Sequence, residues 1–206
     1  MNKVKNILNN IWKAISRVIV TNAIRLYCKI VYRYKVIGKE NIPKDGGLLF
    51  CGNHTSYLDG PLIIITSPRI MRFMAKQELK ENLLFRYLCY AYDAIYVKRD
   101  SKDIGPLKDA LKELKKGGCI GIFPEGTRNG IEKNEGKIKN GASYMSLKTG
   151  AKIIPIGIKK AEKAFNKVTI TYGKPLDLSK LLEGKNPKEV EAEATEILKN
   201  EIMKLI

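Results

Sequence analysis

Histidine is almost absent from this chain of 206 residues, in which it occurs once, at His54. Sites that bind a metal through several histidines are therefore excluded, and catalysis that needs a histidine has one position available. The four cysteines form no Cys-x-x-Cys pair, so zinc and redox motifs lack the required spacing. Most of them lie among apolar residues, and we interpret all four as buried thiols of a reducing compartment: Cys28, Cys51, Cys89 and Cys119.

Long apolar runs are also missing. No stretch reaches the roughly 18 consecutive apolar residues that span a bilayer. The apolar residues near the N-terminus are dispersed, which argues against a cleaved signal peptide. We therefore expect no transmembrane span, and a protein attached to the cytoplasmic face of the cell membrane as a peripheral or monotopic protein.

Acidic residues are absent from the first 39 positions, which hold nine Lys and Arg before the first carboxylate, Glu40. Over the whole chain, 38 Lys and Arg against 21 Asp and Glu give a net charge of +17. Such a charge predicts an anionic partner, which composition alone leaves as nucleic acid, a phospholipid surface or a phosphorylated substrate.

The same N-terminal segment has apolar residues at the three- and four-residue spacing of one helical stripe, with Trp12 on the stripe and most cations off it. An acid-free amphipathic helix of this kind is typical of membrane surfaces, where Lys and Arg reach lipid phosphates. A helix that packs on the core fits the stripe as well. Thr21 and Asn22 interrupt it, so one helix or two would fit. We assign residues 1–33 to this basic helical element and residues 34–206 to a separate domain.

From residue 32 onward, short apolar segments alternate with amphipathic ones. Strands are predicted at residues 32–37, 47–51, 70–74, 94–97, 119–123, 153–158 and 168–172. Helices are predicted at residues 57–65, 81–90, 104–116, 140–149 and 187–205. Strands that alternate with helices indicate an α/β layer fold, and the length suits one domain.

His54 stands where an apolar strand ends and a helix should begin, which is where open α/β folds place their sites. If Asp59 lies in the second turn of that helix, its carboxylate can fold back toward one ring nitrogen. This contact would fix the tautomer and raise the basicity of the other nitrogen. A His–Asp pair without a nucleophile suits deprotonation of a substrate hydroxyl, whereas the plainer interpretation is a histidine that caps the helix.

A second segment, residues 121–130, runs from a strand into a glycine-containing loop that bears Arg128. Backbone N–H groups of such loops can approach an anion, and the planar guanidinium suits bidentate phosphate binding. No Gly-Lys-Ser/Thr follows, so it is not a nucleotide phosphate loop. Further cations end a strand at Lys98 and Arg99 and precede a helix at Lys139, where solvated surface charge is the alternative interpretation.

Taken in order, these segments resemble the PlsC-type family of 1-acyl-sn-glycerol-3-phosphate acyltransferases. Residues 53–59, with His54 followed after four residues by Asp59, are similar to its first motif. Residues 95–99, 123–128 and 154–156 resemble its second, third and fourth motifs. The resemblance covers about residues 35–175 and implies a mixed sheet flanked by helices, preceded here by the N-terminal amphipathic element.

The resemblance also implies transfer of a fatty acyl group from acyl carrier protein or coenzyme A to the sn-2 hydroxyl of lysophosphatidate, giving phosphatidic acid. His54 would take the hydroxyl proton and Asp59 would orient His54. Direct attack needs no enzyme nucleophile, and no Gly-x-Ser-x-Gly elbow is present. No metal or permanently bound cofactor is expected. The remaining implied site residues bind the phosphate or shape its loop: Lys98, Arg99, Glu125, Gly126, Thr127, Arg128 and Lys139.

Other functions remain open at this point. The acceptor could be another lipid alcohol, such as glycerol 3-phosphate or a lyso-ornithine lipid, and a non-catalytic membrane-surface protein would explain the basic helix. Nucleic-acid binding is not expected, because basic and aromatic residues are not interleaved on one recognisable face. The expected partners are therefore a lysophospholipid, an acyl carrier protein or coenzyme A thioester, and an anionic membrane surface.

Overall fold

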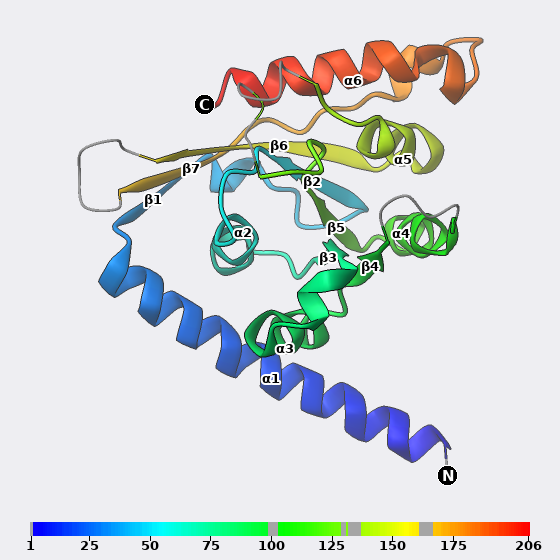
Figure 1. The fold of residues 1–206 in the computed structure, drawn as a ribbon. Helices are drawn as coiled ribbons and strands as arrows, with labels where there is room; N and C mark the ends of the chain where they lie inside the picture. The colour runs from blue at the N-terminus through cyan, green and yellow to red at the C-terminus, as the bar shows by residue number, and fades with distance from the viewer. Residues whose placement is uncertain (1, 99–102, 129–130, 132–136, 161–166) are drawn as a thin grey trace.

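The computed structural model describes residues 2–98, 103–128, 131, 137–160 and 167–206. These residues form a seven-stranded sheet in the order β1-β7-β6-β2-β5-β3-β4, which lies between two layers of helices (Figure 1). Neighbouring strands are parallel except β6 and β7, so the sheet is mixed, as the family resemblance implies. The strands are β1 (Tyr34–Ile37), β2 (Leu48–Gly52), β3 (Arg72–Lys76), β4 (Ile95–Val97), β5 (Cys119–Ile122), β6 (Lys152–Lys160) and β7 (Val168–Tyr172).

Each predicted helix is present, with ends that differ by a few residues. The α-helices are α1 (Asn2–Val31), α2 (Asp59–Thr66), α3 (Leu83–Ala91), α4 (Gly105–Lys115), α5 (Gly141–Thr149) and α6 (Pro187–Met203). Short 3-10 helices are η1 (Lys39–Asn41), η2 (Gln77–Lys80) and η4 (Ser179–Leu182).

The prediction that Asp59 lies in the second turn of its helix is wrong, because Asp59 is the first residue of α2. Its carboxylate accepts the N–H groups of Thr55 and Ser56, and its own N–H donates to the Ser56 carbonyl at 3.3 Å. Side chains that bind nearby backbone groups in this way favour a turn over a helix. The turn therefore occupies the positions where the helix was expected to begin.

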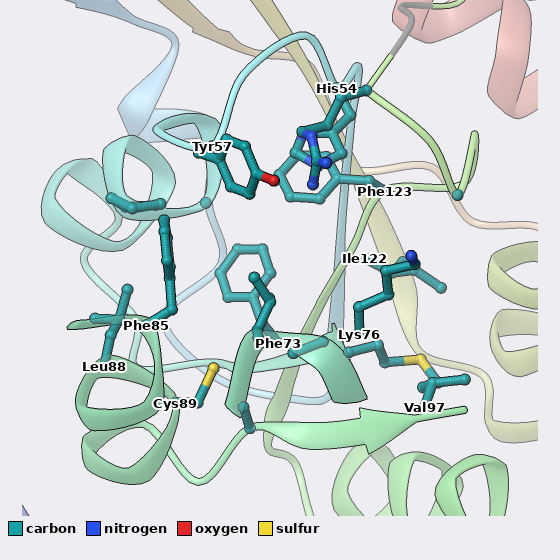
Figure 2. Close-up of a pocket in the computed structure, with 18 of the residues that line it drawn as sticks. His54, Tyr57, Phe73, Lys76, Phe85, Leu88, Cys89, Val97, Ile122 and Phe123 are labelled. Carbon is teal, nitrogen blue, oxygen red and sulfur yellow. The ribbon is translucent and has the colours of Figure 1, made fainter. Parts of the chain in front are cut away.

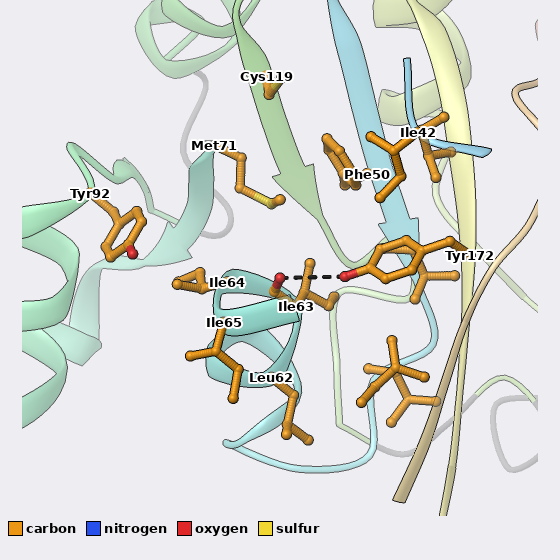
Figure 3. Packing of buried hydrophobic residues seen from close by; sticks show 14 of the residues in the cluster. Ile42, Phe50, Leu62, Ile63, Ile64, Ile65, Met71, Tyr92, Cys119 and Tyr172 are labelled. Carbon is orange, nitrogen blue, oxygen red and sulfur yellow. Dashed lines mark hydrogen bonds between the residues drawn. The ribbon is translucent and has the colours of Figure 1, made fainter. Parts of the chain in front are cut away.

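Helices α1, α2 and α3 cover one face of the sheet, and α4, α5 and α6 cover the other (Figure 1). Strand β2 is buried at every residue: Phe50 packs toward the first group of helices, and Leu49 packs toward the second. Strands covered on both faces are expected to be almost continuously apolar. In the first core, the Tyr172 hydroxyl donates to the Ile63 carbonyl at 3.4 Å (Figure 3). It also lies 2.7 Å from the Thr66 hydroxyl, and burial raises the pKa of the Tyr172 phenol to about 12.

Helix α1 is one continuous helix of 30 residues, which resolves the choice between one helix and two. Thr21 and Asn22 lie within this helix, and the Thr21 hydroxyl bonds the Tyr92 hydroxyl at the end of α3. One side of α1 is buried against α2 and α3, at Ser16, Val20 and Cys28. Most of its other large apolar side chains are exposed: Val4, Ile7, Leu8, Ile11, Trp12, Ile15, Val18, Ile19, Leu26, Tyr27 and Ile30. Among the described residues, no helix combines the length and hydropathy that a membrane span requires.

Candidate active site

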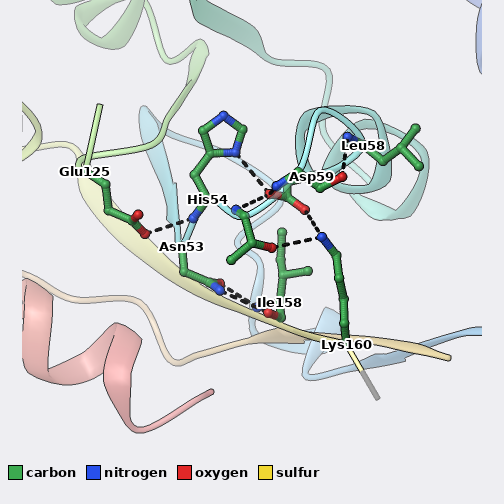
Figure 4. A network of polar contacts seen from close by, with 9 residues as sticks. Asn53, His54, Leu58, Asp59, Glu125, Ile158 and Lys160 are labelled. Atoms are coloured by element: carbon green, nitrogen blue, oxygen red, sulfur yellow. Dashed lines mark hydrogen bonds and ion pairs between the residues drawn. The ribbon is translucent and has the colours of Figure 1, made fainter. Parts of the chain in front are cut away.

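The predicted contact between His54 and Asp59 is present where β2 ends. The His54 Nδ1 atom lies 3.0 Å from Asp59 Oδ2 (Figure 4), and the same oxygen accepts the N–H groups of Thr55 and Ser56 at 2.6 Å each. A carboxylate oxygen offers only acceptors, so Nδ1–H of His54 donates to it. The Nε2 atom is then left as the acceptor, which is the state that a general base needs.

Lys160, at the end of β6, completes the surroundings of the fully buried Asp59. Its Nζ atom lies 3.5 Å from Asp59 Oδ1 and 2.9 Å from the Thr55 hydroxyl (Figure 4). A buried carboxylate is costly unless it is paired and hydrogen-bonded. Lys160 supplies the pairing charge, while the His54 ring and two backbone N–H groups supply the hydrogen bonds.

Two buried polar side chains hold the backbone at Asn53 and His54. The Asn53 amide donates to the Ile158 carbonyl at 3.0 Å and accepts the Ile158 N–H at 2.7 Å, which ties the end of β2 to β6. Glu125 accepts the His54 N–H at 2.8 Å. Glu125 therefore fixes the backbone of His54 from the loop after β5, and it does not line the cavity described below.

The imidazole ring of His54 is held flat against Phe123. The two ring centroids are 4.0 Å apart with an interplanar angle of 10°, and Phe73 lies beside Phe123 at 5.8 Å. Stacking on one face and the Nδ1 hydrogen bond together leave the ring little freedom to rotate. Such restraint is what a general base requires to meet its proton in a fixed geometry.

His54 lines a cavity of about 530 Å³. Figure 2 shows His54 and Tyr57 at one end of it, and Cys89 and Val97 at the other. Most of the lining is apolar and comes from α2, β3, α3, β4 and β5. The volume is within the range of small-molecule sites, and the lining suits a hydrocarbon chain. Burial raises the pKa of the Cys89 thiol, which makes it a poor nucleophile in this wall.

The loop after β5 brings a cation to the His54 end of the cavity. The guanidinium carbon of Arg128 lies 3.8 Å from the ring centroid of Tyr57, and both residues line the cavity. Within the described residues, Arg128 forms no ion pair with a carboxylate. Its charge is therefore available to an anionic ligand.

Lys139 lies beside the same loop, since its N–H donates to the Pro124 carbonyl at 2.8 Å. Gly126 has a φ of +67°, and a Cβ atom added there would come 3.2 Å from Lys139 Cε. A side chain at position 126 would thus strain the backbone and press on the lysine. Gly126, Thr127 and Lys139 all line the cavity, so the structure brings three more predicted site residues to one place.

Comparison with known proteins identifies the family. The sequence profile of the Acyltransferase family matches residues 33–159. The chain belongs to the acyltransferase family.

Two relatives of this acyltransferase are 1-acyl-sn-glycerol-3-phosphate acyltransferases. The protein of Borreliella burgdorferi is 33% identical over 135 residues, which are 64% of this chain and 53% of that protein. The protein of Bacillus subtilis is 29% identical over 161 residues, which are 75% of this chain and 79% of that protein. The chain thus spans about half the length of the first relative.

The crystal structure of the 1-acyl-sn-glycerophosphate acyltransferase PlsC from Thermotoga maritima is similar with a TM-score of 0.66 and 23% identity. The match covers 100% of this chain and 98% of that one, and it shows that the two proteins share the fold.

One predicted phosphate-binding residue of the acyltransferase lies away from the cavity, and another cannot be placed. Lys98 is exposed just after β4 and is not part of the lining, so the structure does not bring it to His54. Arg99 lies outside the described residues.

Several residues of the site were not predicted from the sequence: Asn53 as a backbone clamp, Phe123 as the stacking partner of His54, Tyr57 beneath Arg128, and Lys160. Tyr57 could have been found, because it lies inside the first motif. No sequence pattern separates Lys160 from the many other lysines of the chain, so its role could not be predicted. Among the residues that the structure describes, no three His, Cys, Asp or Glu side chains are grouped to hold a metal ion.

Proposed function

We propose that this acyltransferase moves a fatty acyl group from acyl carrier protein or coenzyme A to the sn-2 hydroxyl of 1-acyl-sn-glycerol 3-phosphate, forming phosphatidic acid in phospholipid biosynthesis. The observation that carries the proposal is the His54–Asp59 pair at one end of an apolar cavity, with Arg128 and Lys139 also in the lining. The names of the bacterial relatives support the choice of acceptor.

In the proposed reaction, Nε2 of His54 takes the proton of the acceptor hydroxyl while the oxygen attacks the thioester carbonyl carbon. The tetrahedral intermediate collapses, the carbon–sulfur bond breaks, and the thiolate leaves with the proton that His54 had taken. Asp59 stabilises the imidazolium form and holds the ring in the productive orientation. The acyl group passes directly between the two substrates, so no residue of the chain is acylated.

The two ends of the cavity suit the two ends of the proposed reactants. The apolar wall around Phe73, Leu88 and Val97 would hold an acyl chain. Arg128 and Lys139 would bind the phosphate, together with Arg99 of the segment that resembles the second motif. The Thr127 hydroxyl supports this assignment: its oxygen is buried in the lining without a hydrogen-bond partner among the described residues, so it can donate to a substrate oxygen.

Replacing Arg128 by alanine is expected to raise the KM for lysophosphatidate about 10- to 100-fold with a small change in kcat. A hydrogen bond to a charged group contributes about 1.5–3 kcal/mol, which is the size of that change. Steady-state kinetics at saturating donor measures it. Lys98→Ala is the matched control, since it removes a cation outside the cavity lining and should leave the KM within about twofold. An unchanged KM in Arg128→Ala would contradict the phosphate role.

Replacing Ala94 by phenylalanine is expected to shift the enzyme toward shorter acyl donors. Ala94 lines the cavity near Cys89, and a ring there would occupy space proposed for the acyl chain. The kcat/KM for long-chain donors should fall about tenfold more than that for short-chain donors. Ala192→Phe, on the exposed side of α6, controls for the added ring. The same loss for all chain lengths would place the acyl chain elsewhere.

We also propose that α1 attaches the enzyme to an anionic membrane surface at its cytoplasmic face. Its exposed apolar residues can enter the headgroup layer, and its cations can meet lipid phosphates. Trp12 is the only tryptophan of the chain and is 55% exposed, so its fluorescence reports on α1 directly. Its emission should shift to shorter wavelength with anionic vesicles, less so at high salt. Equal shifts with neutral and anionic vesicles would contradict the electrostatic part.

The experiment that tests the activity uses the purified chain with lysophosphatidate and with glycerol 3-phosphate, each paired with acyl-CoA and with acyl-acyl carrier protein. Phosphatidic acid is the expected product, and it should form from lysophosphatidate with at least one donor. Acylation of glycerol 3-phosphate alone would assign the other acceptor.

A further inference from the structure

A second cavity lies between α1 and the connection from α2 to β3, and the proposed reaction makes no use of it. Its volume is about 250 Å³. Residues of α1 on one side and of the α2–β3 connection on the other line it, and among them are Arg17, Arg25, Ser67 and Arg69. We call this cavity the arginine groove.

The arginine groove carries unbalanced positive charge. Its lining includes three arginines and no Asp or Glu. Within the described part of the chain, none of the three guanidinium groups forms an ion pair with a carboxylate. Three arginines in the lining of one small cavity produce a positive potential that favours an anion.

Backbone carbonyls hold two of these arginines in place without neutralising them. Arg69 donates to three carbonyl oxygens at 2.9–3.0 Å, and Arg25 donates to the Ile65 carbonyl at 3.3 Å. A guanidinium has five N–H donors, so both side chains keep donors to spare. Arg17 has no hydrogen bond within the described residues, and all five of its donors are uncommitted. Donors of this geometry are suited to phosphate oxygens.

Apolar side chains lie beside this charge. Val18 and Ile70 also line the groove, and they are 61% and 64% exposed. Val18 belongs to the exposed apolar side of α1, which is the part of the molecule proposed to enter the headgroup layer. A ligand that joins a phosphate to hydrocarbon would satisfy both kinds of surface, whereas a free phosphate would satisfy only the arginines.

We propose that the arginine groove binds a phosphate group, supplied by an anionic phospholipid of the membrane in preference to a soluble phosphate compound. This lipid is separate from the acyl acceptor. Ile64 and Tyr92 line both the groove and the catalytic cavity, so the bound headgroup would lie against the wall at the far side of the proposed acyl site. The groove would thereby fix which part of the enzyme faces the membrane.

The test measures flotation of the full chain, without substrates, on phosphatidylcholine vesicles that contain either phosphatidylglycerol or the same fraction of oleate. Arg17→Gln/Arg25→Gln is compared with Lys5→Gln/Lys29→Gln, which removes the same charge from exposed positions of α1 outside the groove. The arginine double variant should lose about tenfold more binding to phosphatidylglycerol vesicles than the lysine double variant. On oleate vesicles, which carry no phosphate, the difference between the two double variants should be smaller. Arg17→Gln alone, which breaks no hydrogen bond with a described residue, should lose binding in the same direction.

A second arm titrates inorganic phosphate into the same variants by calorimetry. One outcome is that only the arginine double variant loses phosphate binding, while the two double variants bind vesicles equally. The groove would then be a phosphate site whose ligand is a soluble compound, and the proposal of a lipid ligand would be wrong. If the two pairs behave alike in both arms, the groove is no phosphate site and the proposal is overturned. Because both arms measure binding without turnover, that outcome leaves the proposed acyl transfer untouched.

Discussion

Replacing His54 by alanine is expected to lower the kcat of acyl transfer by about 10²- to 10⁴-fold, which is the usual contribution of general acid–base catalysis. His54 is the only histidine of the chain, and its Nδ1 is committed to Asp59 at 3.0 Å. No other imidazole could therefore take over the proton transfer. The measurement is kcat at saturating donor and lysophosphatidate.

His54→Asn is the matched variant for this prediction. Its amide can still donate a hydrogen bond toward Asp59, but it has no nitrogen that accepts a proton at neutral pH. Both variants should be about equally inactive. Thermal unfolding of His54→Asn, which keeps a donor toward the buried Asp59, should stay closer to that of the parent than thermal unfolding of His54→Ala. Activity within a few-fold of the parent in either variant would remove His54 from the role of base.

Replacing Asp59 by asparagine is expected to lower kcat by about 10²-fold or more, as the loss of an orienting carboxylate does in other enzymes. The amide has only two possible orientations here. If its oxygen replaces Oδ2, its NH₂ group faces the ammonium group of Lys160. If it is flipped, the NH₂ group faces the N–H groups of Thr55 and Ser56 and forces His54 into the wrong tautomer. Either orientation should also lower the free energy of unfolding by about 1–3 kcal/mol.

Lys160→Met separates the charge of the site from its hydrogen bonds. It keeps Asp59 and its three N–H donors but removes the ammonium group 3.5 Å from Oδ1. We expect kcat to fall by less than about tenfold in this variant, because the tautomer of His54 is preserved. Kinetics of the two variants side by side is the measurement. An Asp59→Asn enzyme as active as Lys160→Met would show that the carboxylate does not orient the base.

Much of the fold could be predicted because it depends on local periodicity. The buried strand at residues 48–52 reads as a continuous apolar run. Helix α6 begins at Pro187 after Asn186, whose side chain caps it, and both residue types are typical of helix starts. The contact between His54 and Asp59 was also predictable, since only one turn of chain separates the two residues.

The rest of the site depends on the order of the strands, which local patterns do not contain. Strand β2 lies between β5 and β6, and this order brings Glu125 and Phe123 to His54 from one side and Lys160 to Asp59 from the other. The sequence also has Lys and Arg residues at several loop and strand ends, and local patterns do not show which of them reach the site. The fold brings Arg128 and Lys139 to the cavity but leaves Lys98 outside its lining.

The most direct test of acyl transfer to a hydroxyl is the rate of thiol release from an acyl-CoA or acyl-acyl carrier protein donor. Lysophosphatidate is compared with an analogue that lacks the free sn-2 hydroxyl. With lysophosphatidate, thiol release should match the formation of phosphatidic acid; with the analogue it should fall to the background rate. Equal rates with both compounds would mean that water takes the acyl group, and the chain would then be a thioesterase and no acyltransferase.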